Sequence, residues 1–375
     1  MEPSSGYSFY KGIGEPKFIC APMVEQSELA FRMLCRKYGT QHCYTPMLHS
    51  RLTVEDKNYL KENFSTCPED RPLTVQFCGN DPEILLKAAK MVEDQCDAVD
   101  INLGCPQGIA RKGHYGSFLL NEPQLIGRMV EKLAKNLKVP VTCKIRVLPN
   151  EEDTMRLVKI IEESGCSLLT VHGRTKEQNK QKVGKCDWEI IKKIKKVMKI
   201  PVYANGGIYN YEDAIQCLEY TGVDGVMSSE SLLENPALFS GKIYNLDQLA
   251  AEYLEICKVY NTDTCYIRPH LFKFLYTGLR QHPDLRDELG KARTMEEFER
   301  ITHRIRELRM QEAPETKLGW YIRYIPMEDR DAYNDYRRSV KQSIMIEEEK
   351  KDEEKVEINN GTMIVEESKV EEISV

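Results

Sequence analysis

The sequence has little that would mark a metal-binding, disulfide-stabilised or membrane-spanning protein. Its 13 cysteines form no Cys-x-x-Cys pair and no Cys/His cluster with zinc-like spacing. No apolar run reaches the length of a membrane span, and residues 1–18 lack the apolar stretch of a signal peptide. We therefore expect reduced cysteines, no bound metal, no membrane insertion, and a location in the cytoplasm, the nucleus or both.

The C-terminal segment also lacks aromatic side chains and accounts for the chain's net negative charge. Residues 344–375 contain eleven acidic and four basic side chains, a net charge of −7. The whole chain carries −6, which leaves a net charge of +1 for residues 1–343. Because a segment so rich in glutamate buries little apolar surface, we expect residues 344–375 to form an acidic disordered tail.

Eight short apolar stretches, each followed by a helical pattern, occupy the first two-thirds of the chain. They are predicted to be strands at residues 17–23, 42–46, 73–77, 97–103, 141–146, 167–172, 201–205 and 225–228. Helix starts are predicted at the capping residues Ser27, Asp81 and Asp187. Eight strand–helix units are typical of a (β/α)8 TIM barrel, so the predicted class is α/β, with the barrel at residues 1–243.

A different pattern follows the barrel. Residues 249–258, 268–279 and 295–310 have helical periodicity. They predict a small C-terminal helical domain at residues 244–343, in which the aromatic segment 320–326 packs back on the body of the protein. The acidic tail follows this domain.

Polar residues stand where the predicted strands end. In a (β/α)8 barrel these C-terminal ends carry the chemistry. In chain order they hold Pro22 and Met23; Gln76; Asn102 and Cys105; Lys144 and Arg146; His172 and Arg174; Asn205, Gly206 and Gly207; Ser228, Ser229 and Glu230. A single polar residue at a strand end is ordinarily a loop residue whose hydrogen bonds are already made. Here, however, polar residues stand at seven of the eight strand ends, which favours a functional site.

Three of these ends have a specific chemical interpretation. Cys105 follows an alternating strand and is either a buried structural thiol or a reactive one. Lys144 and Arg146 share strand parity, so both should point into the barrel mouth, toward an anionic or electron-rich ligand or toward structural carboxylates such as Asp100. Gly206 and the glycine after it would let backbone amides approach a phosphate.

Seven motifs, in order, resemble those of the tRNA-dihydrouridine synthase family. They are APM (21–23), VQF (75–77), NLGCPQ (102–107), KIR (144–146), VHGR (171–174), NGG (205–207) and GVM (225–227). The stretch NLGCPQGIARKGHYGSFL is most similar to the eukaryotic 16/17 branch of that family. One departure is that many members have glycine and arginine after GVM, where this chain has Ser228, Ser229 and Glu230. Backbone amides near Ser229 and Glu230, or another cation, would then contact the flavin phosphate.

The resemblance implies an FMN-dependent enzyme that reduces uridine in tRNA at positions 16/17 of the D-loop, with NADPH as electron donor. It implies hydride transfer from reduced FMN to C6 of uracil and proton transfer from Cys105 to C5. The implied FMN contacts are Pro22, Met23, Val24, Gln76, Lys144, His172, Asn205, Gly206, Gly207, Ser229 and Glu230. The implied substrate contacts are Asn102, Arg146 and Arg174, and we expect a monomer that has the tRNA and NADPH as its partners.

Two segments could bind RNA. Residues 174–185 carry five basic side chains and one acidic one, Glu177, which fits either a phosphate contact or a solvated loop. The helix at 295–310 carries four arginines diluted by glutamates. The resemblance implies that the helical domain at residues 244–343, which contains this helix, is the main tRNA-binding module.

Three alternative functions stay open from the residues alone. They are an FMN barrel acting on a free pyrimidine, such as a dihydroorotate dehydrogenase; a tRNA-binding protein that has lost its chemistry; and a flavin-free phosphate-binding barrel. The presence of Cys105, Lys144 and His172 argues against the second of these.

Overall fold

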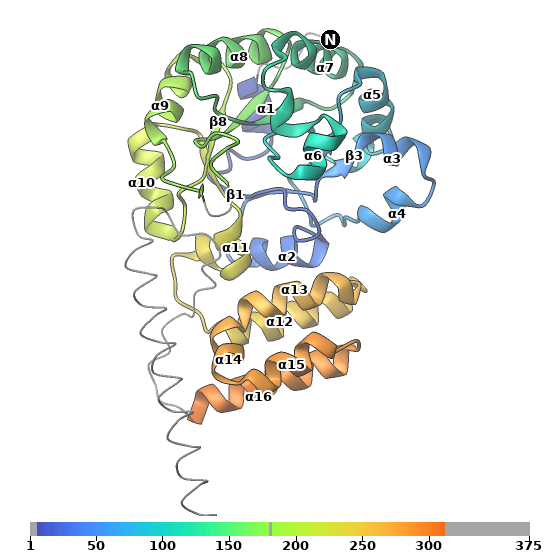
Figure 1. Ribbon diagram of the computed structural model, residues 1–375, viewed down its shortest axis with the longest axis vertical. Coiled ribbons are helices and arrows are strands. Elements are labelled where there is room, and N and C mark those ends of the chain that lie inside the picture. Colours follow the sequence, from blue (N-terminus) through green and yellow to red (C-terminus); the bar gives the residue numbers. More distant parts are fainter. Residues whose placement is uncertain (1–5, 180–181, 312–375) are drawn as a thin grey trace, which may run out of the picture. The chain divides into compact units, whose positions relative to one another are not determined.

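The computed structural model describes residues 6–179 and 182–311 (Figure 1). The barrel and the helices that follow it belong to one compact unit, residues 1–180 and 185–323. A second unit, residues 181–184 and 324–375, contains only three described residues. The predictions for 320–326 and for the acidic tail lie outside the described residues.

Eight parallel strands form a closed barrel, as predicted. Their order is β2-β1-β9-β8-β7-β6-β5-β4, and an additional pairing of β2 with β4 closes the ring. The strands are β1 (Phe18–Cys20), β2 (His42–Tyr44), β4 (Leu73–Cys78), β5 (Ala98–Leu103), β6 (Val141–Arg146), β7 (Leu168–His172), β8 (Val202–Asn205) and β9 (Gly225–Ser228). A short strand β3 (Leu48–His49) pairs in parallel with the end of β4, where Leu48 lies opposite Phe77.

Helices surround the barrel (Figure 1). In chain order they are α1 (Gly6–Gly12), α2 (Leu29–Lys37), α3 (Ser50–Glu55), α4 (Tyr59–Asn63), α5 (Pro82–Lys90), α6 (Gly108–Gly113), α7 (Pro123–Asn136), α8 (Glu151–Glu163), α9 (Trp188–Val197), α10 (Tyr211–Thr221) and α11 (Glu230–Glu234). Short 3₁₀ helices occur at Glu93–Gln95, Gly116–Leu119 and Leu238–Ser240. Among the described residues no helix is both long and apolar enough to cross a membrane.

Two of the three predicted helix caps are confirmed. Asp81 accepts hydrogen bonds from the amides at the start of α5, and Asp187 does so for α9. Ser27 is not the cap of α2, because its hydroxyl is held by the backbone of Met23. The cap is Glu28, whose carboxylate accepts the amide of Phe31 at 3.1 Å.

A second group of helices follows the barrel. It consists of α12 (Leu246–Val259), α13 (Thr264–Phe274), α14 (Tyr276–Gln281), α15 (Pro283–Lys291) and α16 (Met295–Gln311). The prediction of one helix over 268–279 is wrong, because the chain breaks at Leu275 and α13 begins earlier, after the capping residue Asp263. The buried Glu28 carboxylate joins this group to the barrel by accepting hydrogen bonds from Tyr253 at 2.6 Å and His270 at 3.0 Å.

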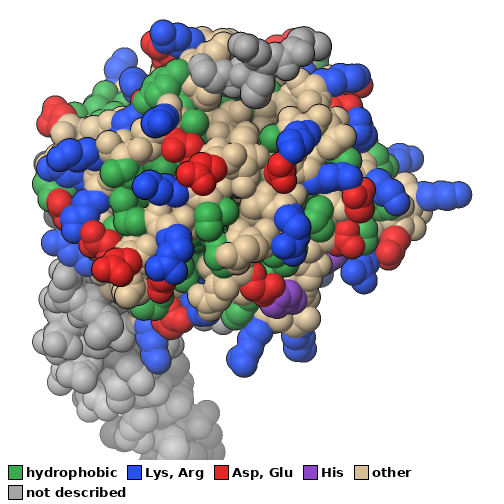
Figure 2. Space-filling model, turned by 90° about the horizontal axis from the view of Figure 1, so that it is seen from above, with side chains coloured by type: hydrophobic (Ala, Val, Ile, Leu, Met, Phe, Trp, Pro, Cys, Tyr) green, Lys and Arg blue, Asp and Glu red, His purple; other side chains and the backbone are tan. Residues whose placement is uncertain are grey.

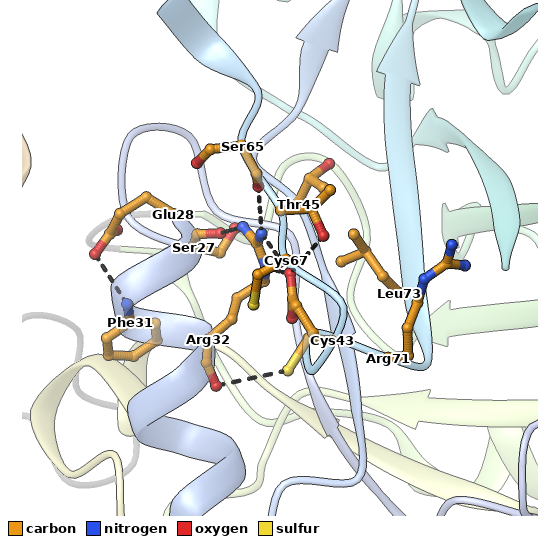
Figure 3. Close-up of polar contacts among 12 residues, drawn as sticks. Ser27, Glu28, Phe31, Arg32, Cys43, Thr45, Ser65, Cys67, Arg71 and Leu73 are labelled. Atoms are coloured by element: carbon orange, nitrogen blue, oxygen red, sulfur yellow. Dashed lines mark hydrogen bonds and ion pairs between the residues drawn. The ribbon is translucent and has the colours of Figure 1, made fainter. Parts of the chain in front are cut away.

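A buried charge network lies beside that contact (Figure 3). Arg32 on α2 is 1% exposed and pairs with the fully buried Asp70 at 2.6 Å. Arg32 also donates to the carbonyls of Ser27 and Ser65, and Arg36 donates to the other oxygen of Asp70. Moving the segment before β4 away from α2 would break this pairing and leave buried charges without partners, which is costly. The network therefore fixes that segment against α2.

Candidate active site at the mouth of the barrel

The closed parallel topology brings the predicted strand ends to one rim. All eight strands run in the same direction, and the register pairs Asn102 with Lys144, Arg146 with His172, and His172 with Asn205. Residues from four consecutive strands therefore form a continuous arc. Among the described residues, no group of three or more His, Cys, Asp or Glu side chains is placed to hold a metal ion.

Cys105 stands on a turn whose backbone is held from both sides. Its amide donates to Oδ1 of Asn102 at 2.9 Å, as does the amide of Gly104 at 3.1 Å. Its carbonyl accepts hydrogen bonds from the amide and the hydroxyl of Ser117 at 3.1 and 2.9 Å. The side chain is partly exposed, and burial raises the pKa of the Cys105 thiol above its usual value. The thiol is therefore protonated near neutral pH.

A directed chain of hydrogen bonds runs from this turn into the barrel. Nδ2 of Asn102 donates to Oε1 of Gln76 at 2.7 Å, and Nε2 of Gln76 donates to Oδ2 of Asp100 at 2.8 Å. Thr142 donates to the other carboxylate oxygen of Asp100 at 2.6 Å. An ionised carboxylate only accepts hydrogen bonds, so Asp100 fixes the orientation of both amides and leaves Oδ1 of Asn102 facing the turn of Cys105. Burial raises the pKa of Asp100 to about 6.

Lys144 and Arg146 have no ion-pair partner among the described residues. Lys144 Nζ donates to Oδ1 of Asn205 at 2.7 Å, rather than to Asp100. Arg146 donates three hydrogen bonds to the carbonyls of Gly104, Thr175 and Gln178. The alternative of structural salt bridges is therefore wrong for both side chains, and their positive charges are available to an anionic ligand.

The neighbouring cations and burial shift the pKa values at this rim. Burial, reinforced by Arg146, lowers the pKa of Lys144 to about 8. Burial, reinforced by Arg174, lowers the pKa of Arg146 to about 10. Burial and the same cations lower the pKa of His172 well below its usual value, so its ring is neutral. Arg174 lies 3.3 Å from Nε2 of His172, and because arginine can only donate, the ring proton is on Nδ1.

The two glycines after β8 form a tight cradle. Gly206 and Gly207 have φ angles of +96° and +74°. A Cβ atom on Gly206 would lie 2.8 Å from Nε2 of His172, and one on Gly207 would lie 3.1 Å from Nε1 of Trp188. Both the backbone conformation and the crowding by the side chains of His172, Cys186 and Trp188 therefore require glycine at these two positions.

Most of the remaining predicted residues follow β1 and β9, which pair side by side, whereas Gln76 lies on β4. Pro22, Met23 and Val24 follow β1, and Val24 is 47% exposed. Ser229 and Glu230 follow β9 at the start of α11, and Glu230 is close enough to raise the pKa of Arg146. Gln76 is fully buried beneath the rim, with both ends of its amide engaged.

The segment 174–185 is only partly an exposed basic loop. Arg174 is 6% exposed and donates to the hydroxyl of Tyr209 at 3.2 Å. Lys176 lies over the ring of Phe118. Residues 180 and 181 lie outside the described residues, so the basic cluster stays a prediction.

Two residues at the rim were missed from the sequence. Tyr209 holds Arg174, and Trp188 donates to the carbonyl of Gly206 at 3.0 Å. Trp188 could have been found, because it is the first residue of a helix with a clear cap and lies at the same end of the barrel. Tyr209 had no signal, since its loop has no periodicity.

The fold and this site define a (β/α)8-barrel enzyme whose rim places a protonated thiol beside a cluster of cations and a glycine cradle. The family model described as dihydrouridine synthase matches residues 19–317. The chain therefore belongs to the dihydrouridine synthase family.

Relatives match over most of this chain. The mouse protein named tRNA-dihydrouridine(16/17) synthase [NAD(P)(+)]-like is 49% identical over 83% of this chain, which spans 66% of that relative. The fission yeast tRNA-dihydrouridine(16/17) synthase [NAD(P)(+)] is 46% identical, over 78% of each chain. A human tRNA-dihydrouridine(20a/20b) synthase [NAD(P)+]-like protein is 42% identical, over 60% of this chain and 70% of that protein.

Solved structures resemble the chain more distantly. A 2-naphthoyl-CoA reductase in complex with 2-naphthoyl-CoA has a TM-score of 0.48 at 10% identity, over 60% of this chain and 49% of that chain.

Proposed function

We propose that this protein is an FMN-dependent tRNA-dihydrouridine synthase that reduces uridine at positions 16/17 with electrons from NADPH. The observation that carries the proposal is the protonated Cys105 thiol at the same rim as Lys144, Arg146 and the glycine cradle. The relatives named for positions 16/17 support this specificity, because they match a larger share of the chain at higher identity than the relative named for 20a/20b.

The residues present fit FMN. The cradle of Gly206 and Gly207 offers backbone amides to the phosphate, and neutral His172 offers its Nδ1 proton. Pro22, Met23, Val24, Ser229 and Glu230 line the neighbouring ends of β1 and β9, and Asn205 holds Lys144 in place. When bound, FMN supplies the hydride for C6 of uracil.

The chain's own side chains supply the remaining chemistry. Reduction of uracil at C6 leaves negative charge at C5 and on the ring carbonyl, which a proton must neutralise. Cys105 carries its proton near neutral pH, and the hydrogen bonds to Asn102 and Ser117 hold its turn in place. The Nη2 group of Arg146 has no partner among the described residues and can bind the substrate. Asn102 and Arg174 complete the proposed substrate contacts.

The function is tested with purified protein, NADPH and two tRNA transcripts. One transcript carries uridine at positions 16 and 17, and its matched control carries cytidine there. We expect a mass gain of two hydrogens at the uridines of the first transcript alone. Reduction of free uracil but not of tRNA would favour the free-pyrimidine alternative, and reduction only at other positions would contradict the proposed specificity.

A pH dependence of FMN binding is expected from Lys144. Its ammonium group loses its proton as the pH rises through about 8, so the affinity for FMN should fall between about pH 7 and about pH 9. Lys144→Arg should hold its affinity across this range, because arginine stays charged. Lys144→Ala should bind FMN weakly at every pH. The measurement is fluorescence titration of flavin-free protein, and a wild-type profile that matches that of Lys144→Ala would contradict the assignment.

A further inference from the structure

The helix α6 begins three residues after Cys105 and presents an apolar side chain to solvent. Ile109 is 65% exposed, whereas its neighbour Ala110 is fully buried and packs with Cys78 and Tyr115. The side of α6 that carries Ala110 is therefore packed against the barrel, and the side that carries Ile109 faces solvent beside the site.

The position of α6 is coupled to that of Cys105. The amide of Tyr115 donates to the carbonyl of Ala110 at 3.0 Å, and Ser117 donates twice to the carbonyl of Cys105. Between them, Gly116 has a φ of +66°, and a Cβ atom there would lie 2.7 Å from the Cys105 carbonyl oxygen. The exposure of Ile109 is thus a property of a fixed element and not of a free loop.

The charge on α6 is uncompensated. Arg111 and Lys112 are exposed and have no ion pair among the residues that the structure describes. No acidic residue occurs between Gly104 and Asn121. On the face that Figure 2 shows, basic and acidic side chains are interspersed. On α9, Lys193 pairs with Glu151 and Lys195 pairs with Asp224.

We propose that α6 displaces the target uridine from its neighbours in the RNA. Ile109 takes the place that the uridine leaves, against the face of the adjacent base, and Arg111 and Lys112 bind the flanking phosphates. An enzyme that acts on a base must take it out of the stack, and apolar side chains inserted between bases are a known way to do so. We propose RNA as the partner of this surface because the positive charges of Arg111 and Lys112 complement the negative phosphates of its backbone. This inference rests on the proposed function.

The first test separates displacement of the base from catalysis. Ile109→Ala should lower kcat/KM on tRNA by about tenfold or more. Ile109→Leu should restore most of it, because a similar apolar volume returns. The loss should be smaller on a short single-stranded RNA, whose bases need less displacement. Met91→Ala serves as the matched control, because Met91 is an exposed apolar residue at the far end of α5.

A direct readout uses 2-aminopurine placed beside the target uridine. Its fluorescence should rise when the wild-type or Ile109→Leu protein binds, and rise much less with Ile109→Ala. Replacing Arg111 and Lys112 with glutamine should weaken tRNA binding and reduce the salt-dependence slope by about one to two. Replacing Lys87 and Lys159, exposed on α5 and α8, should change neither quantity.

Two outcomes overturn the inference in different ways. If Ile109→Ala acts on tRNA at the wild-type rate with unchanged fluorescence, α6 does not displace the base, while the proposed function stands. If the wild-type protein forms no dihydrouridine in tRNA, the proposed function fails and the inference fails with it.

Discussion

Replacing Cys105 with alanine should lower dihydrouridine formation in tRNA by about a hundred- to ten-thousandfold. The thiol is the proton donor proposed for C5, and its raised pKa keeps the proton in place near neutral pH. Without it, the charge that develops on the reduced base has no positioned acid. The measurement is single-turnover formation of dihydrouridine by pre-reduced protein.

Two further variants sharpen this test. Cys105→Ser should recover little activity, because a hydroxyl is a far weaker acid than a thiol. Cys265→Ala should behave as wild type, since Cys265 is an exposed thiol at the start of α13 and is none of the proposed FMN or substrate contacts. FMN content and NADPH oxidation without tRNA should persist in Cys105→Ala. Dihydrouridine formation at the wild-type rate in that variant would make Cys105 a structural thiol.

Replacing Asp70 with asparagine should lower the free energy of unfolding by about 3–5 kcal/mol. Asp70 is fully buried and binds both Arg32 and Arg36, so the substitution leaves buried positive charge without its counter-charge. Denaturant titration followed by circular dichroism measures the loss.

The matched control for Asp70 is an exposed ion pair. Glu131→Gln removes the pair with Lys135 on the surface of α7 and should change stability little, because solvent screens such pairs. If Asp70→Asn unfolds at the same denaturant concentration as the control, the network in Figure 3 does not stabilise the fold.

The helical group beyond the barrel is held by contacts that local sequence does not reveal. Glu28 caps α2 and also binds Tyr253 and His270, which lie more than two hundred residues away along the chain. Ser27 has the better capping preference by residue type. Tertiary contacts decided between the two neighbouring residues, because the buried carboxylate satisfies three donors at once.

The sequence by itself determined the eight strands of the barrel, though not the short β3, and the end of the barrel at which polar residues gather. Strand periodicity and turn residues are local properties, so β6 and the parity of Lys144 and Arg146 could be predicted from a few neighbouring positions. The motifs that follow the strands also identified the family that the comparisons show.

Only the tertiary structure decided which of these groups touch one another. Lys144 bonds to Asn205, 61 residues away, rather than to Asp100, and Asp100 instead orients Gln76. Arg174, expected on a basic loop, is buried against His172. Hydrogen-bond partners and burial depend on how strands far apart in the sequence close into a barrel, and no local preference encodes that closure.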